Sequence, residues 1–264
     1  MSTDVSAAET VVPQEAAVEA VRPRVTWAMS LQSLLGTIVV AVFVITFAVQ
    51  AFQIPSASME NTLLVGDYLL VDKVHFGESG FLPALLPYDR IRHDDIIVFR
   101  FPVHPEQHFV KRVVGIPGDR VKLVNGSVFV NGERVNEPYV IRKSGYTDHY
   151  RDDFPASHYL NGNVEPRWYV EMRKLTDDRG ELIVPENNYF VMGDNRDDSL
   201  DSRYWGFVPR GNIIGRPLMI YFSVAQPNQD GPEITQDGKL LSLAYAVEHL
   251  GTTVRWKRCF RMVH

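Results

Sequence analysis

Residues 121–132 read Val-Lys-Leu-Val-Asn-Gly-Ser-Val-Phe-Val-Asn-Gly, which is two strand-length runs joined by the dipeptide Asn125-Gly126. Asn-Gly suits a two-residue hairpin turn, because both central residues of such a turn take a positive φ that Asn and Gly tolerate. A second dipeptide of this kind, Asn131-Gly132, follows the second run. The stretch therefore predicts antiparallel strands with a hairpin at their centre.

Runs of the same kind occur along most of the chain. Each is apolar or β-branched, has the length of a strand and is bounded by Gly, Pro, Asp or Asn. They lie at residues 68–71, 96–99, 109–114, 121–124, 128–130, 189–192 and 218–222. We predict a mainly β fold, whose antiparallel β-sheet closes into a barrel-like or sandwiched core to hide its edges. Residues 134–188 are more polar and aromatic, and we interpret them as a small inserted subdomain.

One long uncharged segment, the 22 residues from Leu31 to Phe52, precedes all of these runs. A helix of that length crosses the roughly 30 Å hydrocarbon core of a bilayer, at about 1.5 Å per residue. We therefore predict one N-terminal transmembrane helix at residues 31–53. A tail at residues 1–30 precedes it, and a large domain at residues 54–264 follows it.

The charges beside this segment predict its orientation. Arg22 and Arg24 precede it, and no Lys or Arg follows it before Lys73. Because positive residues stay on the cytoplasmic side, we expect a cytoplasmic N-terminus and an extracytoplasmic domain. The alternative is a cleaved secretory signal, since Val49-Gln50-Ala51 resembles a processing site. The segment is, however, longer than the usual apolar region of about 7 to 15 residues, and its leader is acidic.

The composition argues against several classes of function. A formal charge of -5 and a pI near 5.9 argue against a nucleic-acid partner, which would require a basic surface. Cys259 is the only cysteine, so no internal disulfide forms, and it has no partner at metal-ligand spacing. We therefore expect no metal and no other cofactor. The basic tail at residues 255–258 is compatible with an anionic lipid surface, although a solvated terminus is the more common arrangement.

Two hydroxyls follow the uncharged segment in Pro55-Ser56-Ala57-Ser58-Met59. In an extended chain, residues two positions apart point to the same side. One serine can therefore attack as a nucleophile while the other donates a hydrogen bond to the developing oxyanion. Taken alone, the run is more typical of a linker after a membrane helix.

A base for such a nucleophile is offered by residues 108–119, which read His-Phe-Val-Lys-Arg-Val-Val-Gly-Ile-Pro-Gly-Asp. On a strand, Lys111 and Arg112 point to opposite faces, and apolar residues flank both. Burial can lower the pKa of a lysine toward neutrality, whereas arginine stays charged. A buried neutral amine can take the proton from a serine hydroxyl. The alternative is that both cations extend into solvent.

Residues 193–206 read Gly-Asp-Asn-Arg-Asp-Asp-Ser-Leu-Asp-Ser-Arg-Tyr-Trp-Gly. Their spacing is not that of a calcium loop, because counting from Asp197 puts Ser202 where Gly is required and Val208 where a bidentate Glu is required. We interpret the run as a hydrogen-bonded scaffold that could orient a buried lysine. None of the eight His lies in a recognisable nucleophile or metal motif, which disfavours a Ser/His/Asp triad but leaves that alternative open.

Together these runs resemble the type I signal peptidase family, the serine/lysine membrane proteases that remove signal peptides from exported proteins. Residues 55–59 match the nucleophile motif, residues 111–119 match Lys-Arg-Val-x-Gly-x-Pro-Gly-Asp, and residues 193–203 match Gly-Asp-Asn-Arg-x-x-Ser-x-Asp-Ser-Arg. The motifs occur in the family's order, and their joint occurrence is highly specific. It favours the catalytic interpretation of each run over its alternative. Ala57 departs mildly from the Gly that many relatives carry there.

The resemblance implies a role for each matched residue. Ser58 resembles the nucleophile and Lys111 the general base, while Ser56 and the backbone N–H of Ser58 resemble the oxyanion hole. The residues similar to the groups that orient and support the lysine amine are Ser199, Asp201 and Arg203. The positions that resemble the shallow pockets for small P1 and P3 side chains are Phe52, Ile54, Leu63, Val98, Phe109 and Val110.

The implied function is a membrane-anchored serine endopeptidase that removes N-terminal signal peptides from exported preproteins after Ala-x-Ala-type sites, through a Ser/Lys dyad and an acyl-enzyme. The implied partners are preproteins, whose chain would add as a strand beside residues 108–110, and the lipid bilayer. The implied location is the bacterial inner membrane, with a periplasmic catalytic domain. Two alternatives stay open, a non-catalytic membrane-anchored β module that binds peptides and a Ser/Lys peptidase of another substrate class.

Overall fold

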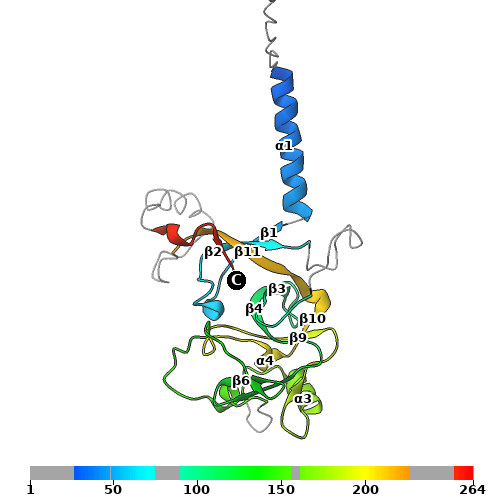
Figure 1. Cartoon of the computed structure of the whole chain (residues 1–264), viewed down its shortest axis with the longest axis vertical. Coiled ribbons are helices and arrows are strands. Elements are labelled where there is room, and N and C mark those ends of the chain that lie inside the picture. The colour runs from blue at the N-terminus through cyan, green and yellow to red at the C-terminus, as the bar shows by residue number, and fades with distance from the viewer. Residues whose placement is uncertain (1–26, 48, 75–89, 156–160, 226–252, 264) are drawn as a thin grey trace, which may run out of the picture. The chain divides into compact units, whose positions relative to one another are not determined.

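The computed structural model describes residues 27–47, 49–74, 90–155, 161–225 and 253–263 (Figure 1). Most of the predicted tail at residues 1–30 lies outside these ranges. The chain divides into two units, Met1–Ala41 and Val42–His264, and each is described by itself.

Helix α1 spans Trp27–Phe47, and large apolar side chains are exposed along the part of it whose side chains are described. Among the described residues, no helix combines the length and the hydropathy that crossing a bilayer requires. Val49–Gln53 forms strand β1, which pairs with β2 (Asp67–Asp72), so α1 ends before the predicted boundary at residue 53. The last residues of the uncharged run form backbone hydrogen bonds to a neighbouring strand instead of continuing the helix.

Among the described residues, the main sheet has eight strands, and all of its pairings are antiparallel. The strands run across the sheet in the order β1, β2, β11 (Ile213–Ser223), β3 (Ile96–Arg100), β4 (His108–Gly115), β9 (Asn188–Met192) and β10 (Val208–Pro209). The eighth strand, β12 (Arg261–Met262), pairs with β11.

Strand β11 joins the two halves of this sheet. Its C-terminal part pairs with β2 and its N-terminal part pairs with β3, and register shifts interrupt both ladders. Bulges of this kind bend a strand and increase its twist. The sheet therefore curls into a half-barrel, which confirms the predicted antiparallel, barrel-like core.

Within the described part of the chain, a second sheet has four strands, in the order β7 (Glu133–Arg134), β6 (Ser127–Val130), β5 (Arg120–Val124) and β8 (Leu182–Ile183). The predicted hairpin joins β5 to β6 through Asn125 and Gly126, whose φ angles are 47° and 74°. These are the positive angles that a two-residue hairpin turn requires. All seven strand-length runs predicted from the sequence lie in strands of the two sheets.

Helices α2 (His149–Asp152) and α3 (Pro166–Leu175) lie within the predicted insertion at residues 134–188. Trp168 and Met172 of α3 pack into one buried cluster with Val121 and Leu123 of β5. The insertion therefore shares its core with strands that precede it in the chain. The remaining short elements are η1 (Ala57–Met59), α4 (Ser202–Trp205), η2 (Arg210–Asn212) and η3 (Trp256–Arg258).

One buried cluster packs β2, β3 and β11 against the loop that follows β1. We call it the loop cluster, and its buried members are Ile54, Met59, Leu63, Leu69, Val71, Ile96, Val98, Ile220 and Val263. Because apolar side chains from the loop and from the sheet exclude water together, this cluster fixes the loop on the sheet.

Candidate active site

The loop after β1 holds Ser58 at the centre of the short turn η1. Met59 and Leu63 follow it at 1% and 0% exposure, and Ile54 precedes it at 2%. All three belong to the loop cluster, so apolar packing on both sides of the turn fixes the position of the Ser58 hydroxyl. We call residues 54–66 the nucleophile loop.

Lys111 lies in the middle of β4, opposite Ile97 of β3. Its side chain is 4% exposed, and its Nζ lies 2.5 Å from Ser58 Oγ. Burial lowers the pKa of Lys111 from 10.5 to about 8, because a poorly solvated site disfavours the ammonium. The charge of Asp201 raises this pKa and that of Arg203 lowers it. Near pH 8 about half of the amine is therefore neutral and able to accept the Ser58 proton.

Arg112 points to the opposite face of β4, as its position on the strand predicts, and it is also buried. It forms a bidentate pair with Asp194, with Nε–Oδ1 and Nη2–Oδ2 distances of 2.8 Å. Its Nη1 donates to the carbonyl of Asp94, and the ring of Tyr139 lies 3.8 Å from its guanidinium carbon. Both cations of the strand are thus inside the protein, one with a carboxylate partner and one against a hydroxyl.

The predicted scaffold contains a fully buried ion pair between Asp201 and Arg203, with Nε–Oδ1 and Nη2–Oδ2 distances of 2.8 Å. Burial alone would raise the pKa of Asp201, but the charge of Arg203, together with hydrogen bonds from Arg203, Gly193 and Ser199, outweighs burial and holds this pKa below its ordinary value. The hydroxyl of Ser199 donates to Asp201 at 2.8 Å, as does the backbone N–H of Gly193 at 3.1 Å. The proposed orientation of the Lys111 amine by Ser199 stays a prediction.

Gly193 lets this scaffold approach the nucleophile closely. A Cβ at this position would lie 2.3 Å from Ser199 Oγ and 2.5 Å from the carbonyl oxygen of Ser58. Two residues on, the backbone N–H of Asn195 donates to that same carbonyl at 3.1 Å. The absence of a side chain at residue 193 is therefore what allows the scaffold and the nucleophile loop to touch.

Ser56, the predicted oxyanion donor, has an extended backbone and lies immediately before η1. Its Oγ is 3.3 Å from Ser58 Oγ. The two hydroxyls therefore lie side by side, as the spacing of the motif predicts, and whether Ser56 donates to an oxyanion stays a prediction.

Five of the six predicted substrate-binding residues belong to one cluster. Ile54, Leu63 and Val98 are buried in the loop cluster, and Phe52 and Val110 pack against it. Phe109 lies on the other face of β4, stacked on Phe101 with ring centroids 4.4 Å apart. Its ring centroid is 5.6 Å from Lys111 Nζ, so it borders the amine and not the loop cluster.

The histidines among the described residues contact other side chains. His93 pairs with Asp119 at 2.6 Å, His104 with Glu106 and His149 with Asp153. The ring of His108 lies against Phe52. The side chain that contacts the Ser58 hydroxyl as a candidate base is Lys111.

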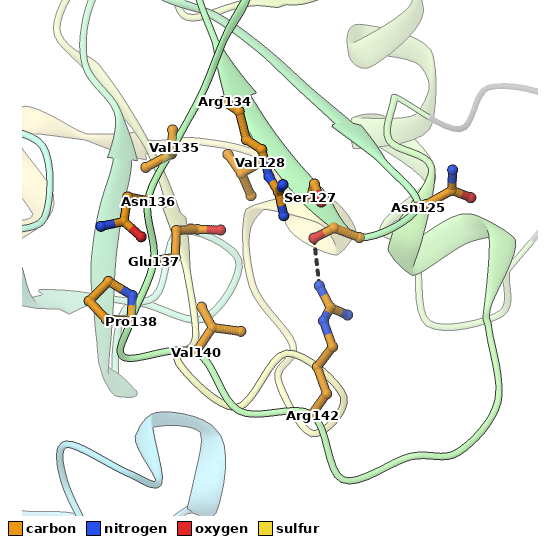
Figure 2. A pocket seen from close by; sticks show the side chains of 11 residues that line it. Asn125, Ser127, Val128, Arg134, Val135, Asn136, Glu137, Pro138, Val140 and Arg142 are labelled. Atoms are coloured by element: carbon orange, nitrogen blue, oxygen red, sulfur yellow. Dashed lines mark hydrogen bonds between the residues drawn. The ribbon is translucent and has the colours of Figure 1, made fainter.

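A cavity of about 640 Å³ lies at the turn between β5 and β6, and none of its lining residues was a predicted site residue (Figure 2). Arg142 crosses it and donates to the carbonyl of Gly126. The apolar part of the lining includes Val128, Val135 and Val140. The dyad is not part of this cavity and lies instead where the nucleophile loop meets β4.

Sequence reasoning missed the network around Arg112. Thr62 of the nucleophile loop donates to Asp194 at 2.5 Å, and Arg112 Nη2 lies 3.3 Å from the Thr62 hydroxyl. Arg112 and Asp194 stand in two consecutive matched motifs. The sequence therefore offered one signal for their pairing, which is their opposite charges. Tyr139 stands in a segment without motifs, and its contact with Arg112 depends on the tertiary fold alone.

Comparison with known proteins gives consistent matches. A family model described as signal peptidase, peptidase S26, matches residues 26–222. Signal peptidase I of Pseudomonas aeruginosa is 37% identical over 200 residues, which cover 69% of this chain and 68% of the relative. Signal peptidase I of Aquifex aeolicus is 32% identical over 240 residues, which cover 80% of this chain and 90% of the relative.

A solved structure of a signal peptidase I from Enterococcus faecalis is 29% identical in sequence and superposes with a TM-score of 0.32. The superposition covers 48% of this chain and 97% of that one.

Proposed function

The chain belongs to the signal peptidase family, peptidase S26, and is a serine endopeptidase; from this premise we propose that it removes N-terminal signal peptides from exported preproteins after Ala-x-Ala-type sites, with Ser58 as nucleophile and Lys111 as general base. The observation that carries the proposal is the 2.5 Å contact between Lys111 Nζ and Ser58 Oγ. A buried lysine with a lowered pKa is a base suited to a serine hydroxyl near neutral pH.

The proposed reaction is acyl transfer in two halves. Neutral Lys111 takes the proton of Ser58, whose Oγ attacks the scissile carbonyl and forms a tetrahedral oxyanion. Ser56 and the backbone N–H of Ser58 donate to that oxyanion. The lysine ammonium then returns the proton to the leaving amine, which departs as the mature protein. Water attacks the remaining ester with Lys111 again as base, and the signal peptide is released.

The Ser199, Asp201 and Arg203 scaffold fixes the electrostatic setting of the base. Asp201 favours the lysine ammonium and Arg203 disfavours it, so the two charges shift the pKa of Lys111 in opposite directions. Both charges are buried and hydrogen-bonded to each other, which restrains their positions. Burial lowers the pKa of Lys111, and we propose that this pair, in which the charge of Asp201 has the larger effect, keeps that pKa from falling so low that protonation of the leaving amine fails.

The substrate is proposed to add as an extended strand beside residues 108–110. Strand β3 pairs with β4 from His108 to Arg112, whereas β9 pairs with β4 only at Arg112, Val113 and Gly115. Among the described strands, one edge of β4 is therefore unpaired beside the first three residues. A peptide there would pair its backbone with β4, and its alternate side chains would face the predicted pocket residues.

We also propose that the protein is a single-pass membrane protein, with residues 1–30 cytoplasmic and residues 54–264 extracytoplasmic. The uncharged run from Leu31 to Phe52 and the Arg residues before it support this topology. The bacterial inner membrane is the site at which such an enzyme meets exported preproteins, and the lipid bilayer is its second proposed partner.

The test is incubation of the detergent-solubilised full-length protein with a preprotein, with both products identified by mass. We expect one cut directly after an Ala-x-Ala-type sequence. A stable complex without any cut would instead support the peptide-binding β module. Cuts confined to substrates without signal peptides would support a Ser/Lys peptidase of another substrate class.

A further inference from the structure

The C-terminal segment of the described chain, residues 253–263, is attached to β11. A β-bridge joins Val254 to Val224, and β12 pairs with Met219 and Ile220 of β11. Val263 is 9% exposed and is a buried member of the loop cluster. This segment was predicted from the sequence as a basic tail, yet the structure turns two of its cations inward.

Arg258 makes the most extensive of these inward contacts. Its Nη2 and Nε lie 2.5 Å and 3.2 Å from the two carboxylate oxygens of Asp67, and Nη2 also donates to the carbonyl of Thr62 at 2.9 Å. Asp67 is 0% exposed and also accepts from the Leu64 backbone N–H and the Ser223 hydroxyl. One guanidinium thus bridges the first residue of β2 and the backbone of the nucleophile loop.

Arg255 adds a second tie to the same loop. Its Nη2 donates to the carbonyl of Val65 in the loop and, at 2.6 Å, to the carbonyl of Val224, the residue after β11. Lys257, between the two arginines, is exposed. Arg255 and Arg258 face the nucleophile loop and form these contacts. The contacts therefore depend on the position of each cation and not on the overall basic charge of the tail.

The loop carbonyl that Arg258 binds belongs to a residue in contact with the site. The Thr62 backbone N–H donates to the carbonyl of Met59, the residue after Ser58. The Thr62 side chain donates to Asp194, which pairs with Arg112, the neighbour of Lys111 on β4. Arg258 is therefore connected through Thr62 both to the turn that holds the nucleophile and to the strand that holds the base.

We propose that Arg258 is a positioning residue for catalysis, which holds the nucleophile loop at Asp67 and Thr62 so that Ser58 Oγ stays within reach of Lys111 Nζ. This role rests on the proposed function. Effective general-base catalysis requires hydrogen-bond distance between the two groups, and a displacement of about 1 Å caused by a remote change can lower a rate on the order of 100-fold. Pairing of the peptide with the edge of β4 involves a surface that Arg258 does not contact, so we expect the change in KM to be small beside the change in kcat.

The experiment compares two variants with the wild-type full-length protein in detergent. Arg258→Lys keeps the charge but cannot bind Asp67 and Thr62 in the same geometry, because an ammonium lacks the planar guanidinium fork. The double variant Asp67→Asn/Arg258→Gln removes the ion pair without leaving an unpaired buried charge. Lys257→Gln, which removes the charge of an exposed cation one residue away, is the control. The kcat and KM for a preprotein are measured at a temperature well below each melting midpoint.

We expect kcat to fall about 10- to 100-fold in both Arg258 variants with KM within about twofold of wild type, and Lys257→Gln to match wild type. A decrease that only follows the unfolded fraction, including loss of the fold in both variants, assigns Arg258 to stability alone and contradicts the proposal. An unchanged kcat in folded variants also contradicts it. Absence of cleavage by the wild-type protein in the same assay contradicts the proposed function instead.

Discussion

Lys111 Nζ lies 2.5 Å from Ser58 Oγ, although the two residues are 53 positions apart in the sequence. The contact joins the centre of β4 to the turn after β1, and both side chains are more than nine-tenths buried. A lysine in this setting has a pKa of about 8 in place of 10.5, which puts its change of charge within the pH range of ordinary assays.

The rate should follow deprotonation of Lys111. Since the neutral amine is the active form, kcat/KM is expected to rise with pH through a midpoint near 8 and to level off above about pH 9. At pH 6 only about 1% of the amine is neutral, so the rate there should be about 100-fold below the plateau. Initial rates of preprotein cleavage from pH 6 to pH 10 check this. A profile with its midpoint near 6.5, the ordinary pKa of histidine, would point to a histidine base.

The burial of Lys111 should also lower the free energy of unfolding at neutral pH. Between pH 8 and pH 10.5 the unfolded chain holds a proton that the folded chain has lost, so folding stability rises with pH across this window. Replacing Lys111 with Met should therefore stabilise the fold at pH 7 by up to about 3 kcal/mol, and the difference should shrink toward pH 10.5. Denaturant unfolding of both proteins at the two pH values measures it. A Met variant less stable than wild type at pH 7 would contradict the conclusion that burial disfavours the Lys111 ammonium.

The strands and the hairpin were predictable because their signals are local. Alternating apolar runs and the Asn125-Gly126 turn are read within a few residues, and the structure places every predicted strand. The end of α1 was placed too late because an uncharged apolar run suits a helix and a buried strand alike. Only the pairing of β1 with β2, about 20 residues later, distinguishes the two.

The site was predictable where its residues stand in motifs and not where long-range folding assembles it. The pairing of Arg112 with Asp194 crosses 82 positions, and the contact of Arg258 with Asp67 crosses 191. No local pattern records such distances. The burial of Arg112 also depends on Tyr139, which no motif includes.

The buried ion pair of the scaffold should shift the pH profile in a direction set by the charge removed. Asp201→Asn removes a charge that raises the pKa of Lys111, so the midpoint of the rate profile should move to lower pH; Arg203→Gln should move it to higher pH. Each single variant is expected to lose about 3 to 5 kcal/mol of stability, because one buried charge loses its partner. The double variant restores charge balance and should bring the midpoint back toward the wild-type value. Equal midpoints in all four proteins would show that this ion pair does not influence the pKa of Lys111.

A side chain at residue 193 should displace the dyad. The Cβ of Gly193→Ala would lie within 2.5 Å of both Ser199 Oγ and the Ser58 carbonyl oxygen, so one of the two must move. We expect kcat to fall on the order of 100-fold, as for other small misplacements of reacting groups. Gly145→Ala is the control, because a Cβ there meets nothing within 4 Å. Wild-type activity in Gly193→Ala would show that the close approach is not needed.

The central claim is that Ser58 and Lys111 act as nucleophile and base, and its most direct test is preprotein cleavage by Ser58→Ala and Lys111→Ala in detergent, with circular dichroism to confirm that each variant is folded. Both variants are expected to keep the fold, and neither should release the mature protein, as this claim requires. Turnover retained by either folded variant would contradict it.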